Sequence, residues 1–303
     1  MSAISIKNLC KSFQDVKALA DVNLDIDKGA VFGVLGPDGA GKTTLLRILA
    51  GVMTADSGTV NILGFDITAD IESAKQHIGY LSQRFSLYPD LTVSENIDFY
   101  SRLFKVDKLE SYKRKAKLLD FSRLEPYADR TAKHLSGGMK QKLALSCALI
   151  HTPKILILDE PTTGVDPISR REFWKILYDL LTEGVTIIFA TPYMDEAERA
   201  NRVALLHEGK ILSCETPEYL KQQYSHHLVG LITDNNRLCR NLLQDEFGAQ
   251  NVLFFGDKLH IKIQDYDAGV QAITNILQQA GIELLSIERI VPGMEDVFID
   301  AIT

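Results

Sequence analysis

GPDGAGKTT, residues 36–44, is the stretch of sequence that decides the fold of this chain. It follows the apolar run of residues 31–35 and continues into a helical apolar pattern over residues 43–50. A buried strand, a glycine-rich turn and a helix in this order open a parallel α/β domain. We therefore expect an α/β core that begins with this unit.

The same nine residues match the spacing of a phosphate-binding loop. Glycines permit positive φ, so successive backbone N–H groups converge on one point, which the positive end of the following helix also faces. Lys42 would place its charge between the β- and γ-phosphates, and the Thr43 hydroxyl could ligate Mg²⁺. A glycine-rich turn without a ligand is the alternative. The ATP-binding residues expected here are Gly36, Pro37, Asp38, Gly39, Ala40, Gly41, Lys42, Thr43 and Thr44.

A second chemical signal is an apolar strand pattern, residues 155–158, that ends in two acids. Asp159 would hold Mg²⁺ directly or through water. Glu160 is turned the other way and could accept a proton from an attacking water. Acids also occur at plain solvated strand ends, but beside a phosphate-binding loop the catalytic interpretation is favoured.

The remaining pattern divides the chain into two domains, residues 1–223 and 224–303. The first contains further strand patterns and an insertion, residues 84–152, that contains helical patterns and no convincing strand. The second restarts as β-α-β-β-α-β, the order of a small α+β ferredoxin-like fold. Expected strands of the first domain are 4–9, 22–26, 78–81 and 185–190, and expected helices of the insertion are 94–104 and 108–121. In the second domain we expect strands 227–232, 252–255, 258–263 and 284–289 and helices 237–247 and 268–280.

Composition excludes several classes of protein. The chain has 303 residues, is 46% hydrophobic and carries a formal net charge of −7. An acidic balance argues against nonspecific binding to nucleic acid. The apolar runs are too short to cross a membrane, so we expect no direct membrane insertion. The cysteines lack metal-type spacing and are expected to be reduced thiols.

Four further motifs resemble those of ATP-binding cassette (ABC) ATPases, and together they cover residues 1 to about 220. LSGGMKQ, residues 135–141, resembles the signature motif, and YLSQ, residues 80–83, resembles the Q-loop. GVDP, residues 164–167, resembles the D-loop, and Phe13 fits the aromatic residue that stacks on adenine. Met139 and the tail VPGMEDVF, residues 291–298, resemble the bacterial multidrug and antibiotic-export branch, which is daunorubicin-resistance-like and of ABC-2 type.

The resemblance implies a P-loop ATPase core with an inserted helical subdomain, acting as a head-to-tail dimer with itself or with another cassette. Gln83 would then join Glu160 in catalysis and join Thr43 and Asp159 at Mg²⁺. It also implies ATP and Mg²⁺ as cofactors, an integral-membrane permease as partner, and a cytoplasmic location at the inner face of the membrane. The signature residues acting in trans would be Leu135, Ser136, Gly137, Gly138 and Met139, and Asp166 would serve the D-loop.

Two residues depart from the family pattern. Pro192 stands where the family usually has a histidine that hydrogen-bonds the γ-phosphate, and proline has no donor. Losing one aligned donor typically costs about 2.7–4 kcal/mol of barrier. The fold should tolerate the change, because Thr191 can cap a helix whose first turn accepts Pro192. Asp38 replaces the usual asparagine and would weaken phosphate binding unless it points away.

From these departures we hypothesise an asymmetric pair, in which this chain's own site hydrolyses slowly and its signature completes a site on a different ATPase. The function expected is export of drugs or other small amphipathic molecules. A regulatory ATP-binding subunit without catalysis is the alternative, and a non-transport ABC ATPase is less favoured because the chain has one cassette and an acidic balance. Asp195, Glu196 and Glu198 are interpreted as acids of the first helical turn.

Overall fold

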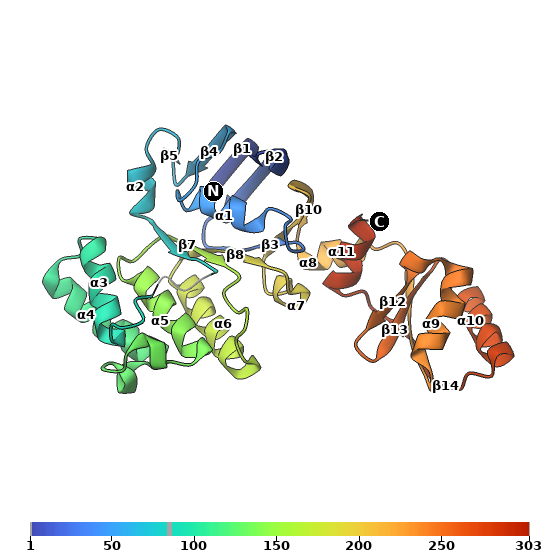
Figure 1. Cartoon of the computed structure of the whole chain (residues 1–303). Helices are drawn as coiled ribbons and strands as arrows, with labels where there is room; N and C mark the ends of the chain where they lie inside the picture. The colour runs from blue at the N-terminus through green and yellow to red at the C-terminus, as the bar shows by residue number, and fades with distance from the viewer. Residues whose placement is uncertain (1, 84–86, 303) are drawn as a thin grey trace. The chain divides into compact units, whose positions relative to one another are not determined.

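The computed structural model describes residues 2–83 and 87–302 (Figure 1). The chain forms two compact units, Met1–Pro217 and Glu218–Thr303, which we call the N-terminal and C-terminal units. The division lies a few residues before the expected position after residue 223, because helix α8 (Pro217–Gln222) is grouped almost wholly with the C-terminal unit. Across the described ranges, no helix combines the length and apolarity that spanning a membrane requires.

The central sheet of the N-terminal unit has six strands. In spatial order they are β10 (Lys210–Glu215), β9 (Arg202–His207), β3 (Val31–Leu35), β8 (Thr186–Thr191), β7 (Ile155–Asp159) and β6 (Ile78–Leu81). All neighbours pair in parallel except β10, which closes one edge antiparallel to β9. β3, β7 and β8 are buried along their whole length, which explains their continuous apolar sequence. The strands expected at 31–35, 78–81, 155–158 and 185–190 are confirmed as β3, β6, β7 and β8.

A second, antiparallel sheet packs on the same core. Its order is β2 (Val16–Asp27), β1 (Ser2–Phe13), β4 (Ser57–Ile62) and β5 (Phe65–Asp66), and the strands expected at 4–9 and 22–26 lie within it. Helix α1 (Lys42–Leu49) lies between the two sheets in Figure 1, and apolar side chains from both sheets and from α1 form one buried cluster. The helix that follows the glycine-rich loop is therefore fixed on two sides.

The inserted segment is helical where the structure describes it, from residue 87 onward. It comprises α3 (Val93–Leu103), α4 (Lys108–Ser122), α5 (Gly137–Leu149) and the short 3₁₀ helices Glu125–Tyr127 and Ala132–His134. Their apolar faces share a core that includes Leu135, with Met139 packed against it. Between residues 87 and 152 no strand is present, only an isolated bridge between Thr92 and Thr131, as expected. Residues 84–86 of the expected subdomain lie outside the described residues.

Three more helices complete the N-terminal unit. They are α2 (Ile71–Lys75), α6 (Pro167–Thr182) and α7 (Met194–Ala197). Helix α6 contacts β8 and α5 contacts β6, so these helices cover the face of the central sheet opposite α1 (Figure 1). The carboxyl ends of β3, β7 and β8 remain as the edge where connecting segments meet.

The C-terminal unit has the expected β-α-β-β-α-β order. Its sheet is antiparallel throughout, in the order β12 (Val252–Phe255), β13 (Lys258–Ile263), β11 (His227–Thr233) and β14 (Leu284–Ile290). Side chains from α9 (Asn236–Phe247) and α10 (Tyr266–Ala280) build its core with this sheet. A 3₁₀ turn (Ala249–Asn251) precedes β12, and α11 (Met294–Ile302) follows β14. This is the ferredoxin-like arrangement that the sequence predicted.

Candidate nucleotide-binding site

The loop between β3 and α1 has a shape that only glycine permits at two positions. A Cβ on Gly41, whose φ is 109°, would lie 2.3 Å from the backbone oxygen of Ala18. One on Gly36 would lie 2.2 Å from the backbone oxygen of Leu206. Gly41 is also the N-cap of α1 and supplies no side-chain hydrogen bond to it. The first N–H groups of this helix are therefore not capped by its N-cap residue, which suits an anion.

Lys42 lies inside this loop and is only 4% exposed. Its Nζ donates hydrogen bonds to the carbonyl oxygens of Gly36, at 2.8 Å, and Pro37, at 2.9 Å. Its distance to Oε1 of Glu160 is 3.9 Å. Burial lowers the pKa of Lys42, and the nearby acids, Glu160 foremost, partly offset that effect. The loop therefore holds a buried ammonium group beside its own backbone.

Asp159 and Thr43 form a pair of hard oxygen ligands. Asp159 ends β7 fully buried, and its Oδ1 accepts a hydrogen bond from Oγ1 of Thr43 at 3.0 Å. Its Oδ2 is buried and has no hydrogen-bond partner among the described residues. Burial raises the pKa of Asp159, although the Thr43 hydrogen bond opposes the shift. A hydroxyl and an unsatisfied carboxylate oxygen fit Mg²⁺, which usually takes one or two protein carboxylates together with substrate phosphates.

Glu160 and Gln83 are in contact, as their assignment to one catalytic site requires. Nε2 of Gln83 donates to Oε2 of Glu160 at 2.9 Å, and Oγ1 of Thr163 donates to the same oxygen at 3.3 Å. The backbone N–H of Glu160 donates to the carbonyl of Ala190 at 3.0 Å. Glu160 has a φ of 49°, a left-handed value that side-chain-bearing residues adopt rarely. Gln83 thus contacts Glu160, and its role as an Mg²⁺ ligand stays a prediction.

The signature and D-loop segments meet at the start of α5. Oγ of Ser136 accepts a hydrogen bond from the N–H of Met139 at 3.3 Å, which caps α5. A Cβ on Gly138 would lie 2.5 Å from Oγ of Ser169 on α6, so glycine is needed for this close approach. Asp166 caps α6 by accepting from the N–H of Ser169 at 2.9 Å. The two motifs therefore form one packed unit.

Two of the predicted binding residues lie at the surface. Phe13, at the end of β1, is 46% exposed, and Nζ of Lys11 lies 5.6 Å from its ring centroid. A ring with an open face can stack on another aromatic group. Asp38 is exposed on the loop, so its carboxylate is in contact with solvent.

The segment after β8 differs from what the sequence indicated. Helix α7 begins at Met194 with Tyr193 as its N-cap, so Thr191 does not cap it and Pro192 does not lie in its first turn. The reason is that Thr191 still belongs to β8, where it pairs with Leu35. Its Oγ1 accepts from the N–H of Tyr193 at 3.0 Å.

Sequence reasoning also missed a buried acid. Asp195 and Glu196 lie in the first turn of α7, as expected, whereas Glu198 is the C-cap residue, so its interpretation as a first-turn acid is wrong. Asp195 and Glu198 are exposed, but Glu196 is fully buried, which the sequence did not predict. Its carboxylate accepts hydrogen bonds from Trp174 on α6, at 3.2 Å, and from Thr191, at 2.7 Å. No local pattern separates Glu196 from its neighbours, because two of its partners, Thr162 and Trp174, are 34 and 22 residues away in the sequence.

Comparison with known proteins extends these findings. A family model described as ABC transporter matches residues 19–163. The chain is 39% identical over 305 residues to the probable multidrug ABC transporter ATP-binding protein YbhF of Escherichia coli, covering 99% of this chain and 52% of that protein. The chain thus spans about half the length of that relative. It is 33% identical to the Nod factor export ATP-binding protein I of Rhizobium etli, covering 99% of this chain and 93% of that protein.

Two solved structures share the fold of the N-terminal unit. One is an ATP-binding subunit of an ABC transporter, with a TM-score of 0.67 and 27% identity, covering 74% of this chain and 93% of that one. The other is a dimeric ATP-binding cassette in a post-hydrolysis state, bound to ADP and Pi, with a TM-score of 0.64 and 28% identity. It covers 70% of this chain and 98% of its own.

Proposed function

Because this chain belongs to the exporter-type ATP-binding subunits of ABC transporters, we propose that it binds MgATP and hydrolyses it to drive export. The cargo proposed is a drug or another small amphipathic molecule. The observation that carries the proposal is that Lys42 and Thr43, at the start of α1, meet Asp159 and Glu160 at the end of β7. A buried cation, a hard-oxygen pair and a general base are the parts that phosphoryl transfer to water requires.

In the proposed reaction, the loop amides and the start of α1 bind the phosphates, and Lys42 exchanges its carbonyl contacts for phosphate oxygens. Mg²⁺, held by Thr43 and Asp159, would supply charge neutralisation at the phosphates. Glu160 takes a proton from the water that attacks the γ-phosphorus, while the bond to the β-phosphate oxygen breaks and ADP leaves. Gln83 holds the Glu160 carboxylate in place through its amide.

We propose that the active form pairs two cassettes head to tail, with this chain's signature facing the partner's nucleotide. Ser136 with the N–H groups of Gly137 and Gly138 would contact the γ-phosphate there, because backbone donors at a helix start suit an anion. Packing of Gly138 against Ser169 ties that contact to the D-loop, which fits a site shared between subunits. The dimeric state of a solved relative supports this arrangement.

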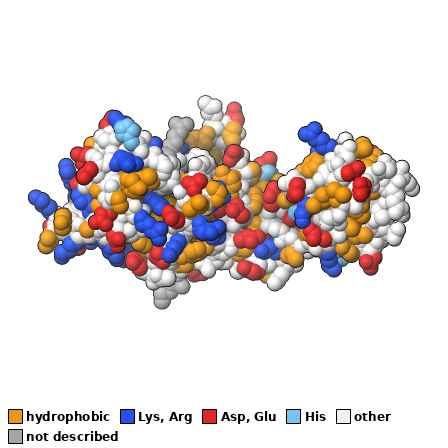
Figure 2. Space-filling view, turned by 90° about the horizontal axis from the view of Figure 1, so that it is seen from below, with side chains coloured by type: hydrophobic (Ala, Val, Ile, Leu, Met, Phe, Trp, Pro, Cys, Tyr) orange, Lys and Arg blue, Asp and Glu red, His pale blue; other side chains and the backbone are white. Residues whose placement is uncertain are grey.

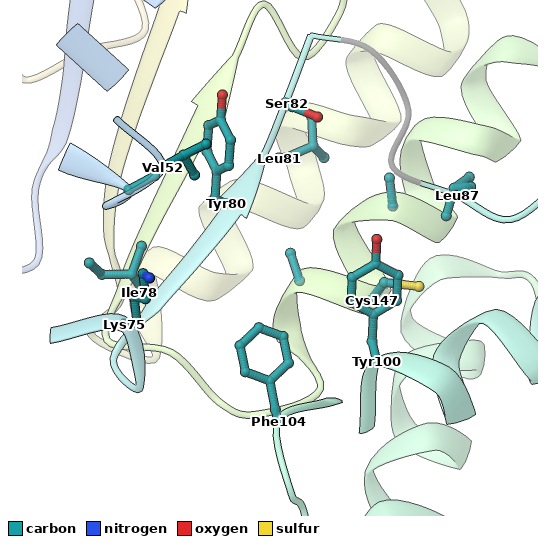
Figure 3. A pocket seen from close by; sticks show the side chains of 13 residues that line it. Val52, Lys75, Ile78, Tyr80, Leu81, Ser82, Leu87, Tyr100, Phe104 and Cys147 are labelled. Carbon is teal, nitrogen blue, oxygen red and sulfur yellow. The ribbon is translucent and has the colours of Figure 1, made fainter. Parts of the chain in front are cut away.

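A permease helix would engage the N-terminal unit at an apolar pocket of about 230 Å³ (Figure 3). Tyr80 and Leu81 of β6 line it on one side, and Tyr100, Phe104 and Cys147 line it on the other. Burial, and then the charge of Asp159, raises the pKa of the Tyr80 phenol to about 12. β6 also leads into Gln83. We therefore expect a helix bound in this pocket to affect Asp159 through Tyr80, and Glu160 through Gln83.

Two other functions remain as candidates. Pro192 favours a regulatory subunit that binds ATP and turns it over slowly or not at all, since it provides no donor. A non-transport cassette acting on nucleic acid is disfavoured by the net charge of −7. On the face that Figure 2 shows, acidic and basic side chains are interspersed, which is a poor match for a phosphate backbone.

Calorimetry on the full-length chain tests nucleotide binding directly. We expect a binding heat with MgATP that Lys42→Ala weakens roughly 10- to 150-fold, since a charged hydrogen bond contributes about 1.5–3 kcal/mol. Lys113→Ala, which removes an exposed lysine of α4, is the matched control and should bind like the unmodified chain. Absence of heat from the unmodified chain at millimolar MgATP would refute the proposal. Binding without any hydrolysis, alone or with its permease, would favour the regulatory alternative.

A further inference from the structure

The buried carboxylate of Glu196 joins three segments of the N-terminal unit. It accepts hydrogen bonds from Oγ1 of Thr162, from Nε1 of Trp174 at 3.2 Å, and from Oγ1 of Thr191 at 2.7 Å. All three partners are at most 1% exposed. Nε of Arg170 lies 3.9 Å from Oε1 of Glu196 and provides a compensating positive charge. A fully buried acid whose hydrogen bonds are satisfied in this way makes the surrounding segments rigid.

Two of these partners lie close in sequence to Glu160 and to Pro192. Thr162 lies two residues after Glu160, and Thr191 is the last residue before Pro192. The N–H of Glu160 also donates to the carbonyl of Ala190, the residue before Thr191. Hydrogen bonds and chain connections therefore close a ring that runs from Glu160 through Ala190, Thr191, Glu196 and Thr162 back to Glu160.

This ring explains how Glu160 keeps its left-handed backbone, with φ at 49°. Such conformations persist where the surroundings over-determine them. Ala190 fixes the residue from one side, and Glu196, through Thr162, fixes the turn that follows it. The same turn leads to the D-loop, because the N–H of Val165 donates to the carbonyl of Thr162 at 3.1 Å.

We propose that Glu196 is a positioning residue for hydrolysis, fixing the turn after Glu160 against the segment that carries Pro192. The inference rests on the proposed function. Glu196 lies outside the nucleotide site and acts through Thr162 and Thr191, so it controls the placement of the general base and leaves nucleotide affinity unchanged.

The chemistry of the cluster requires a carboxylate. An ionised carboxylate only accepts hydrogen bonds, and all three contacts come from donors. An amide at residue 196 could accept from Thr162 and Trp174, but its NH₂ group would then face Thr191. Oγ1 of Thr191 already accepts from the N–H of Tyr193, so its own hydrogen would lose its acceptor. Glu196→Gln therefore keeps the shape of the side chain and breaks one specific link.

The test compares Glu196→Gln with Glu198→Gln, which changes an exposed acid of the same segment. We expect Glu196→Gln to lower the single-turnover rate of ATP hydrolysis by roughly 10- to 100-fold, because a small misplacement of a catalytic group is costly. Its dissociation constant for MgATP should stay within about twofold of the unmodified value, which separates turnover from binding. Glu198→Gln should change neither quantity.

Thr162→Val provides a second, milder variant of the same ring. We expect it to slow hydrolysis in the same direction, and we expect the double variant to be no slower than the worse single variant, because both break one connection. Unaltered hydrolysis in Glu196→Gln would overturn the inference, as would a parallel loss of affinity and thermal stability, which marks a purely structural role. If the unmodified chain itself hydrolyses no ATP, the proposed function fails first, which is a distinguishable result.

Discussion

The segments that follow β3 and β8 begin side by side, since Leu35 pairs with Thr191 in the central sheet. They differ in the groups that they offer to a bound nucleotide. After β3, the loop holds a buried lysine and leads into a helix whose N-cap residue, Gly41, has no side chain to cap it. After β8, Pro192 stands at the position that we predict to be the switch position of the site, and proline has no donor. The fold is intact at both places. We infer that binding ATP and turning it over place separate demands on one sheet edge.

The two segments differ because phosphate binding and orientation of the attacking water use different groups of the protein. Phosphate binding draws on several backbone N–H groups and a helix dipole, in a loop whose shape requires glycine at residues 36 and 41. Orientation of the attacking water depends on single side chains, and one substitution removes such a contact. The segment after β8 keeps its conformation through Thr191 and Glu196, so loss of the donor leaves the backbone in place.

The largest effect on the rate of hydrolysis is expected for Glu160, at the end of β7. Glu160→Gln keeps the shape of the side chain but removes the proposed proton acceptor. General base catalysis contributes roughly 10²- to 10⁴-fold, so hydrolysis at this chain's own site, measured on the purified chain, should fall by that factor. The affinity of the chain for MgATP, measured by calorimetry, should stay within a few-fold, because Lys42, Thr43 and Asp159 are untouched.

Glu183→Gln is a suitable control, since it neutralises an exposed acid at the end of α6, outside the nucleotide site. If Glu160→Gln left turnover by the complex unchanged, this chain's own site would be regulatory, and the signature would be its main contribution to hydrolysis.

Restoring a donor at residue 192 tests whether its absence slows hydrolysis. Pro192→His should raise the hydrolysis rate of the purified chain by up to roughly 100- to 1000-fold, the usual effect of one aligned transition-state donor. MgATP affinity should change little. Combining Pro192→His with Glu160→Gln should abolish the gain, because a positioned water still needs a proton acceptor. Fast turnover by the unmodified chain would show that another group replaces the histidine.

Much of the nucleotide site could be predicted because its signals are local. The loop of residues 36–44 and the acids after β7 each combine a short motif with a strand, and the structure brings Thr43 and Asp159 together as expected. The order of elements in the C-terminal unit could also be predicted, since apolar periodicity marked each strand and helix. Parallel strands place their carboxyl ends at one edge, so separate motifs converge without further information.

Glu196 could not be predicted because its environment is assembled from residues that are distant in sequence. Thr162 and Trp174 lie 34 and 22 residues away, and neither carries a motif that points to an acid. The position of α7 was missed for a related reason. Threonine followed by proline suits a helix start, but the pairing of Thr191 with Leu35 extends β8 through that residue. In both cases tertiary contacts override a local preference.

The smallest expected effect concerns Asp38, the one departure within the loop after β3. Its carboxylate is exposed, and water and salt screen its repulsion of the phosphates. Exposed charge interactions amount to about 0.2–1 kcal/mol, so Asp38→Asn should tighten MgATP binding by roughly 1.4- to 5-fold at low salt and by less at high salt. Calorimetry at two ionic strengths checks this, with Asp120→Asn on α4 as control. A gain in affinity that is larger than tenfold and independent of salt would mean that Asp38 faces the phosphates directly. The loop after β3 would then carry a residue that weakens MgATP binding, just as the segment after β8 carries one that is proposed to slow hydrolysis.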